Sequence, residues 1–186
     1  MRQPWDEVYD WAGLRVRSLV TLRYPRPTPI LDVGAGQGKY RTLLPEYPNV
    51  DACEIWEPTV HEYDLPQRYR NVFVCDVYDM LLHLRVNDLR EYGVMIFGDV
   101  LEHLDRERAQ ESLRNAYAVC PDVIVVVPYM YPQDAHDGNE YQRHLQDDLT
   151  PELMSEAYPE LRLVDLESRN MRPFKGLYRA LRGSTR

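Results

Sequence analysis

Three alternating glycines mark the first segment of the sequence that could carry chemistry. Gly34, Gly36 and Gly38 follow Asp32 and a valine, at the end of a short apolar run. A turn built from glycines lets the backbone approach a ligand without side chains in the way. The dinucleotide fingerprint G-x-G-x-x-G is not met, because position 39 is a lysine. An acid so close to the turn favours a ligand that carries an ammonium group over a purely anionic one.

Two further acids lie at the ends of later apolar runs. Glu54 is at the end of the run at 50–55, where nucleotide-binding α/β folds use a carboxylate to accept hydrogen bonds from ribose hydroxyls. Asp76 follows the run at 71–75, and its carboxylate could accept a hydrogen bond from an exocyclic amine such as that of adenine. Together with Asp32, these acids suit a nucleoside with a cationic tail. S-adenosylmethionine is such a ligand.

A second constellation follows the apolar run at 93–98. Asp99, Glu102 and His103 have the spacing that places residues on one face of a helix. Two carboxylates and an imidazole can bind a divalent cation such as Mg²⁺ or Mn²⁺, and a bound cation lowers the pKa of a substrate hydroxyl. The same spacing also fits a capping box, in which Asp99 and Glu102 stabilise a helix start and do no chemistry.

Histidine offers a catalytic route that needs no metal. Because imidazole titrates near neutral pH, His103 or His144 could act as a general base. A purely structural role is the alternative for either side chain. If proximity and alignment dominate the reaction, no strong base is needed.

Apolar runs and helical stretches alternate along the chain that must position these residues. Strands are predicted at 30–33, 50–55, 71–75, 93–98 and 122–127. The clearest helix between them spans 105–119, with Asp105 placed to cap it. Such alternation predicts an α/β fold, a doubly wound parallel sheet with helices on both faces.

Both ends of the chain add elements to this pattern. Apolar spacing predicts an N-terminal helix over 5–20, which the proline-rich segment 24–29 stops. Another helix is expected at 150–158. The runs at 161–167 and 176–181 are joined by too short a link for a parallel crossover, so we expect an antiparallel hairpin.

Composition bounds the class of protein. With 186 residues, of which 44% are hydrophobic and 28% charged, we expect one globular domain. The charged start and the absence of an apolar run of roughly 18 residues argue against a signal peptide or membrane helix, so a cytoplasmic protein without membrane association is expected. A net charge of −8 argues against non-specific nucleic-acid binding. Three cysteines without a C-x-x-C pair indicate small core residues rather than disulfides or a thiolate zinc site.

The ordered set of segments resembles the class I S-adenosylmethionine-dependent methyltransferases over about residues 28–130. The matching pieces are 30–38, Glu54, Cys75-Asp76-Val77 and 94–104. The resemblance implies a Rossmann-like, mostly parallel seven-stranded sheet whose last strand is antiparallel. It further implies that the cofactor is held by Asp32, Gly34, Ala35, Gly36, Gly38, Glu54, Ile55, Asp76, Val77, Gly98 and Asp99.

The Asp-x-x-Glu-His segment is similar to the metal site of two groups in that family. These are the ubiquinone-pathway O-methyltransferases and the small-RNA 3′-terminal 2′-O-methyltransferases. The second group implies a further histidine after the fifth strand, here His144. The implied ligands of Mg²⁺ or Mn²⁺ are then Asp99, Glu102, His103 and His144, although Asp99 departs from the glutamate of those groups and shortens the reach by one methylene.

The long irregular stretch 128–141 is the predicted acceptor side, because long loops in compact domains are usually functional or disordered. Its tyrosines, Met130 and His136 could form the wall of a pocket, and an N-terminal helix bearing Trp5, Tyr9 and Trp11 could close it. Packing of these aromatics in the core is the alternative. Segments 128–132 and 138–144 resemble glycan- and natural-product-modifying methyltransferases, which implies a small hydroxylated acceptor such as a sugar or secondary metabolite.

Two alternative functions stay open. The basic C-terminal segment would suit an RNA ribose 2′-O-methyltransferase; its basic residues are Arg169, Arg172, Lys175, Arg179, Arg182 and Arg186. A non-catalytic cofactor-binding scaffold is the other alternative. In each case we expect one domain over 1–186, with an N-terminal helical segment at 1–27, a cofactor-binding core at 28–130, and a substrate-side loop and C-terminal hairpin at 131–186.

Overall fold

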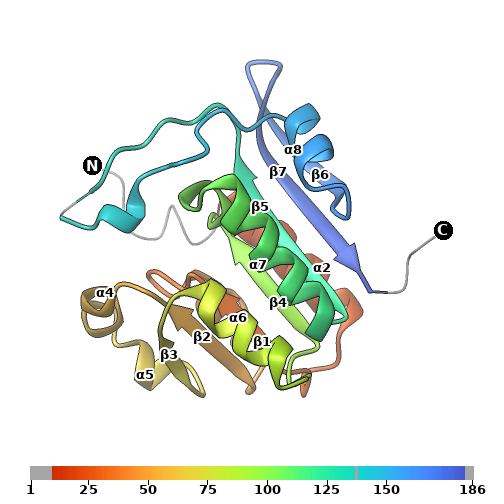
Figure 1. Cartoon of the computed structure of the whole chain (residues 1–186). Coiled ribbons are helices and arrows are strands. Elements are labelled where there is room, and N and C mark those ends of the chain that lie inside the picture. Colours follow the sequence, from red (N-terminus) through yellow and green to blue (C-terminus); the bar gives the residue numbers. More distant parts are fainter. Residues whose placement is uncertain (1–9, 137, 183–186) are drawn as a thin grey trace.

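The computed structural model describes residues 10–136 and 138–182, and within them seven strands form one sheet. The strand order is β3-β2-β1-β4-β5-β7-β6 (Figure 1). The first five strands are mutually parallel, whereas β7 is antiparallel to both β5 and β6. The strands are β1 (Ile30–Val33), β2 (Val50–Glu54), β3 (Val72–Val74), β4 (Val94–Gly98), β5 (Asp122–Pro128), β6 (Arg162–Arg169) and β7 (Arg172–Leu181). The predicted doubly wound, mostly parallel sheet with its C-terminal hairpin is confirmed.

The strand order reverses between β1 and β4. From β1 the chain builds outward to β2 and β3, then returns to β4 on the other side of β1. Because the connections leave β1 and β4 in opposite directions, a crevice forms beyond the carboxyl ends of these strands. The glycine turn after β1 and the Asp99 segment after β4 both lie at this edge.

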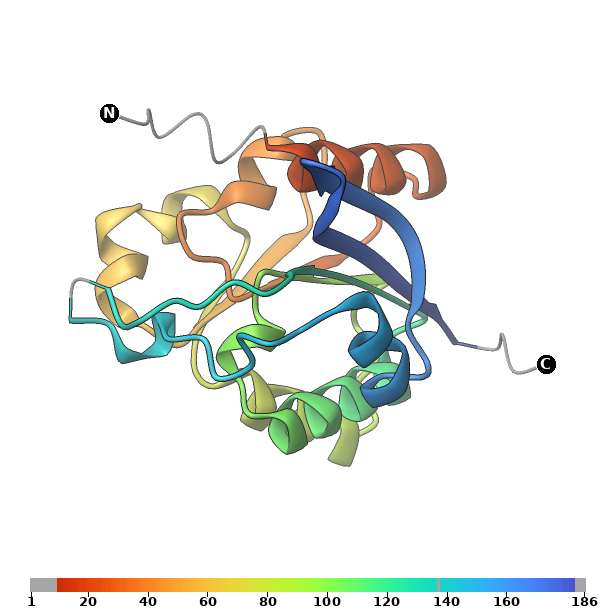
Figure 2. The ribbon, with the colours of Figure 1, turned by 90° about the horizontal axis from the view of Figure 1, so that it is seen from above.

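Helices cover both faces of the sheet, as Figure 2 shows. One face packs against α2 (Trp11–Arg23), α3 (Lys39–Leu43), α4 (Glu57–Glu62) and α5 (Leu65–Arg68). The other packs against α6 (Val77–Val86), α7 (Arg106–Val119) and α8 (Pro151–Ala157). Each face of the sheet has its own hydrophobic core. Successive residues of a strand point to opposite faces, so Ile30 packs in the core of the first face and Leu31 in that of the second. No helix within the described ranges is both long and apolar enough to span a bilayer.

Side-chain caps fix where the helices begin. Asp105 accepts a hydrogen bond from the backbone N–H of Arg108, which confirms the predicted start of α7. Thr150 caps α8 in the same way. The predicted N-terminal helix corresponds to α2, which continues past residue 20 and ends at Arg23, because Tyr24 precedes a proline and is extended. Residues 5–9 of that prediction, with Trp5 and Tyr9, lie outside the described residues.

The three cysteines are free, and two of them are core residues as expected. Cys53 and Cys120 are buried, whereas Cys75 is half-buried. The sulfur atoms of Cys53 and Cys75, from the adjacent ends of β2 and β3, lie 3.8 Å apart.

Candidate active site

A cavity of about 500 Å³ opens at the carboxyl ends of the central strands. Its walls come from the glycine turn after β1, the segment after β4, the segment after β5, and the start of β7. Of the residues predicted for the site, it brings together Gly34, Ala35, Gly36, Gly98, Asp99, Glu102, His103 and His144. The cavity thus joins the glycine turn to the acid–histidine constellation.

Strand β2 holds the glycine turn in place. The backbone N–H groups of Gly34 and Ala35 both donate to the carbonyl of Cys53, at 2.8 and 3.1 Å. Gly36 donates its N–H to the Glu54 carboxylate at 2.8 Å, and the other oxygen of Glu54 accepts from the N–H of Trp56 at 2.9 Å. Glu54 therefore lies at the turn itself, although it does not line the cavity.

Arg68 of α5 fixes the far side of the turn, and sequence reasoning missed it. Its guanidinium donates to the carbonyls of Gln37 and Gly38, at 2.7 and 2.8 Å, and to the hydroxyl of Thr42 at 2.7 Å. Gly38 has φ +74°, and a Cβ there would lie 2.6 Å from Nη1 of Arg68. The turn is thus shaped by an arginine that lies far along the sequence.

Asp32 lies outside the cavity, contrary to the expectation that it would face a ligand's ammonium group. Its side chain is 1% exposed and accepts a hydrogen bond from the Tyr69 hydroxyl at 2.5 Å. Burial raises the pKa of Asp32 to about 7, with the nearby Glu54 acting in the same direction. Asp32 is therefore a buried acid of β1 that is hydrogen-bonded to Tyr69, the residue that follows α5.

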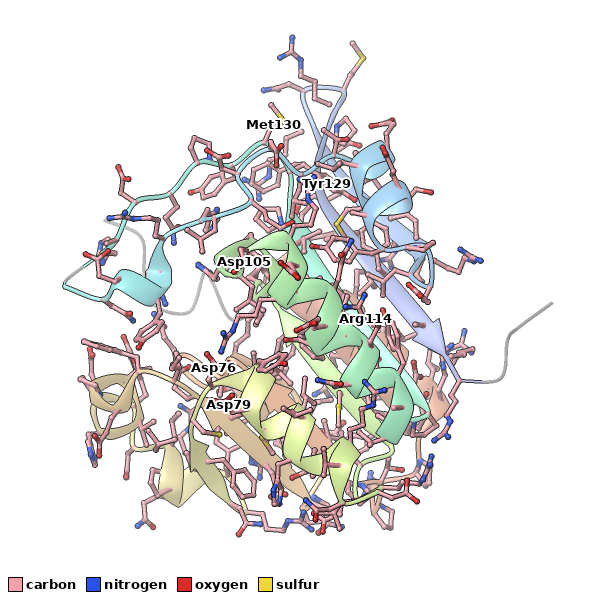
Figure 3. The ribbon with its side chains drawn as sticks, viewed as in Figure 1. Asp76, Asp79, Asp105, Arg114, Tyr129 and Met130 are labelled. Carbon is pink, nitrogen blue, oxygen red and sulfur yellow. The ribbon has the colours of Figure 1, made fainter. Side chains whose placement is uncertain are left out.

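Asp76 is occupied by local partners. Its carboxylate caps α6 by accepting from the N–H of Tyr78 at 2.8 Å, and pairs with the guanidinium of Arg108 at 3.0 Å. Figure 3 shows Asp76 at the start of α6 and Asp105 at the start of α7. Val77 is buried and Ile55 half-buried, and neither lines the cavity. The predicted nucleoside contacts thus flank the cavity rather than line it.

Asp99 does not begin a helix. It adopts a left-handed conformation, with φ +58°, and only a short 3₁₀ turn, η1 (Leu101–His103), follows before α7. Since no side chain caps η1, neither the shared helix face nor the capping box predicted for Asp99 and Glu102 is present. The Asp99 carboxylate instead pairs with Lys175 at 2.8 Å and has Lys39 at 4.0 Å.

Glu102, His103 and His144 converge on one point. Their ligand atoms all lie within 4.8 Å of one another, and Asp99 is not a member of this group. Glu102 is 1% exposed, and neither carboxylate oxygen has a hydrogen-bond partner among the described residues. Burial, and secondarily the charge of Asp99, raise the pKa of Glu102. A buried carboxylate without partners is costly unless a cation or proton satisfies it.

Both imidazoles place the same ring nitrogen, Nδ1, beside a backbone carbonyl. Nδ1 of His103 lies 3.2 Å from the carbonyl of Arg143, and Nδ1 of His144 lies 2.6 Å from that of Tyr131. Each Nδ1–H can thus donate to a carbonyl, which leaves the Nε2 lone pair available. Burial and the neighbouring His144 lower the pKa of His103, so its ring is kept neutral. The donor set therefore fits a divalent cation.

Aromatic rings border the acceptor side. Tyr131 lies with its ring 5.7 Å from that of His144 and 6.4 Å from that of Phe174, over which the Arg169 guanidinium stacks at 3.6 Å. Of the other predicted wall residues, Tyr129 is buried, whereas Met130 and His136 are exposed and outside the cavity lining. Figure 3 shows Tyr129 and Met130 where β5 ends.

Two other predicted aromatics lie away from the cavity. Trp11, the first residue of α2, packs against the hydrophobic core, as the alternative of core packing predicted for this residue. Tyr141 is exposed and its ring lies 6.0 Å from that of Trp56, which joins the segment after β5 to the end of β2.

We compared the chain with protein families, curated sequences and solved structures, and only solved structures are similar to it. No protein-family model and no curated protein sequence matches the chain. Among solved structures, the N-terminal domain of EvdMO1 with SAH bound has a TM-score of 0.66 at 12% identity, over 97% of this chain and 85% of that one. The bifunctional kinase-methyltransferase WbdD gives 0.65 at 18% identity, over 96% of this chain and 41% of that one.

An S-adenosylmethionine-dependent methyltransferase from Clostridium acetobutylicum gives a TM-score of 0.65 at 13% identity, over 94% of this chain and 91% of that one. The EvdMO1 domain has also been crystallised in the presence of SAH and D-fucose. These similarities show that the chain has the Rossmann-like methyltransferase fold.

Proposed function

We propose that the protein is an S-adenosylmethionine-dependent methyltransferase that methylates a hydroxyl group of a small acceptor, such as a sugar or secondary metabolite. The observation that carries this proposal is the single cavity that joins Gly34–Gly36 to Glu102, His103 and His144. One wall suits the cofactor and the other suits the acceptor. One catalytic domain over residues 1–186 would contain both.

The cofactor side is proposed from the turn outward. When bound, S-adenosylmethionine supplies a methyl group on a positively charged sulfur. The glycine turn lets the backbone approach it, and Glu54 lies within hydrogen-bond distance of Gly36, where it can turn to the ribose hydroxyls. Asp76 and Val77 at the start of α6 are proposed for the adenine, with Gly98 and Asp99 nearer the sulfur.

A divalent cation is proposed for the acceptor side. Glu102, His103 and His144 supply one oxygen and two nitrogen ligands, which suits Mn²⁺ and, less closely, Mg²⁺. The orphaned carboxylate of Glu102 supports this assignment. When bound, the cation lowers the pKa of a coordinated hydroxyl. Asp99, paired with Lys175, is not proposed as a ligand.

Histidine can serve the same reaction without a cation. The acceptor hydroxyl loses its proton to Nε2 of His103 or His144 as the oxygen takes the methyl group and the sulfur keeps the bond electrons. General-base assistance of this kind is worth ~10²–10⁴ in rate. Because the pKa of His103 is lowered by burial, its ring is available as a base at neutral pH.

The acceptor class is supported by the aromatic border and by one similar protein. Tyr131 and Phe174 offer flat apolar faces beside His144, on which a sugar or aromatic ring can lie. The EvdMO1 domain was crystallised with D-fucose present. RNA is less favoured, because Lys175 and Arg179 of the basic segment are neutralised by Asp99 and Asp122.

Calorimetry with S-adenosylhomocysteine tests the cofactor assignment. We expect the metal-stripped protein to bind it at micromolar Kd, about −8 kcal/mol. Glu54→Gln should weaken binding, whereas Glu156→Gln, at an exposed position of α8, should not. Transfer of a labelled methyl group to hydroxylated acceptors, with and without Mn²⁺, then separates an enzyme from a non-catalytic scaffold. No binding by the wild type would contradict the proposed function.

A further inference from the structure

Two segments that are far apart in the sequence carry the three candidate cation ligands, and their backbones are hydrogen-bonded to each other. Glu102 and His103 lie in η1, whereas His144 lies in the segment after β5. The carbonyl of Glu102 accepts from the backbone N–H groups of Leu145 and Gln146, at 2.7 and 3.0 Å. These contacts join Glu102 to the two residues that follow His144, so they set how far apart the candidate ligands lie.

The side chain of Gln146 makes a second connection between the same two segments. It is 4% exposed, and its Nε2 donates to the backbone carbonyls of Leu101 and Leu104, at 2.8 and 3.1 Å. These two carbonyls lie on either side of Glu102 and His103 in the sequence. One amide group thus binds both ends of the turn that carries two of the three candidate ligands.

The other atom of the Gln146 amide is also used. Its Oε1 accepts from the hydroxyl of Tyr158 at 2.9 Å and has Nε of Arg106 at 3.4 Å, and Tyr158 is itself buried after the end of α8. Only the nitrogen of an amide can donate to carbonyls, and only its oxygen can accept from a hydroxyl. The Gln146 amide therefore has one orientation, which joins η1, the segment after β5 and α8.

The η1 turn depends on partners outside itself for its shape. It is a single 3₁₀ turn, which has poorer hydrogen-bond geometry than an α-helix, and no side chain of the described residues caps its start. The carboxylate of Glu102 makes no hydrogen bond within the described ranges that would hold that side chain in place. The backbone of η1 therefore sets the position of Glu102, and Gln146 binds that backbone at both ends.

We propose that Gln146 is a positioning residue for the cation site: by binding both ends of η1, its amide keeps Glu102 and His103 within reach of His144. This inference rests on the proposed function, because it requires that these three side chains bind a cation. Gln146 does not line the cavity and supplies no ligand atom. It acts through the backbone of η1, so its loss should weaken cation binding and leave cofactor binding unchanged.

Calorimetric titration of the metal-stripped protein with Mn²⁺ tests this role. Gln146→Met keeps a side chain of similar length and removes both amide atoms. We expect Mn²⁺ affinity to fall about tenfold, at the lower end of the range for residues that orient metal ligands. Affinity for S-adenosylhomocysteine, measured without metal, should change less than about threefold. The reason is that β2 and Arg68, rather than Gln146, hold the glycine turn.

Two control variants separate positioning from packing. Tyr158→Phe removes a hydrogen bond to the same amide but leaves both donations to η1 in place. Gln110→Met removes an amide of α7 that donates to the carbonyl of Ala157 at 2.8 Å rather than to η1. Both controls should bind Mn²⁺ within about threefold of wild type. Gln146→Asn keeps a shorter amide, so its Mn²⁺ affinity should lie between those of wild type and Gln146→Met.

The contrary outcomes are distinguishable. If Gln146→Met binds Mn²⁺ as tightly as wild type, or if Tyr158→Phe weakens Mn²⁺ binding as much as Gln146→Met does, Gln146 does not position the site and the proposal is overturned. Should Gln146→Met fail to fold, Gln146→Asn replaces it, and wild-type Mn²⁺ affinity in that variant has the same meaning.

The wild-type protein separates this inference from the proposed function. If it binds S-adenosylhomocysteine but no Mn²⁺, the cation site and this inference both fail, while the cofactor assignment stands. If it binds neither, the proposed function fails, and this inference fails with it.

Discussion

The ring of Tyr40 fills the space that a side chain at position 98 would need. A Cβ built on Gly98 would lie 2.7 Å from Cζ of Tyr40, with Cε2 and Oη closer still. Gly98 has no positive φ, so its glycine is required by this neighbour rather than by its own backbone. The carboxyl end of β4 and the start of α3 are thereby packed directly against each other at the cavity.

Gly98→Ala should destabilise the protein by about 1–3 kcal/mol, because an aromatic ring packed in the core cannot yield without disturbing its surroundings. Urea denaturation measures this loss. In a Tyr40→Ala background the same substitution should cost much less, since the ring is gone. Equal costs in both backgrounds would show that the contact does not limit position 98.

Arg68→Met should loosen the glycine turn. The variant keeps the apolar stem and loses the hydrogen bonds to Gln37, Gly38 and Thr42. We expect stability to fall by about 1–3 kcal/mol and S-adenosylhomocysteine affinity to fall about tenfold, because the turn is no longer held in its binding shape. Calorimetric titration with S-adenosylhomocysteine measures the affinity, with Arg114→Met, at an exposed position of α7, as the control. Unchanged affinity would show that Arg68 is not needed to hold the turn in its binding shape.

Asp32 makes stability depend on pH. Between about pH 4 and pH 7 the native state holds a proton on Asp32 that the unfolded chain has lost, so this group's contribution to stability falls as pH rises. Asp32→Asn cannot titrate, and relative to wild type it should gain about 3 kcal/mol from pH 5 to pH 8. Urea denaturation at both values, beside the exposed Asp134→Asn, measures the difference. A constant difference between variant and wild type would show that Asp32 titrates normally.

His103→Ala should lower the rate of methyl transfer far more than cofactor affinity. The rate is expected to fall ~10²–10⁴-fold, whether His103 acts as a base or as a metal ligand. Mn²⁺ affinity distinguishes the two, because only loss of a ligand weakens it. The exposed His83→Ala is the matched control. Equal loss of rate and S-adenosylhomocysteine affinity would count against a catalytic role.

RNA should bind weakly or not at all. Arg179 pairs with the buried Asp122, and Lys175 with Asp99, so the basic segment has less free charge than its sequence indicates. We expect no mobility shift of labelled RNA at low salt. A salt-dependent shift would return the ribose methyltransferase to consideration.

Local sequence patterns predicted the strands well, because a strand buried on both faces is an apolar run. The same reasoning does not predict the first part of β7. Arg172 and Pro173 pair only with β6, in the hairpin beyond the central sheet, and no apolar run marks them. A pattern read from hydrophobicity cannot find a strand whose partners lie outside the core.

The candidate site was harder to predict, because its geometry depends on pairs far apart in the sequence. Nothing near Asp99 indicates that Lys175 would take its carboxylate, or that its backbone would be left-handed. Asp76 likewise meets Arg108 of another helix. The sequence does contain one signal: Lys39 and Lys175 are the two lysines of a chain that otherwise uses arginine, and both line the cavity.

The antiparallel course of β7 sets how the protein can be tethered. The strand leaves the cavity at Lys175 and ends at Leu181, opposite Asp122 at the amino end of β5 (Figure 1). A fusion joined beyond Arg182 therefore departs from the edge of the sheet remote from the cavity. Asp10, by contrast, stands in the cavity wall. Immobilisation on a sensor surface should use the carboxyl-terminal side, which leaves the mouth open to ligand.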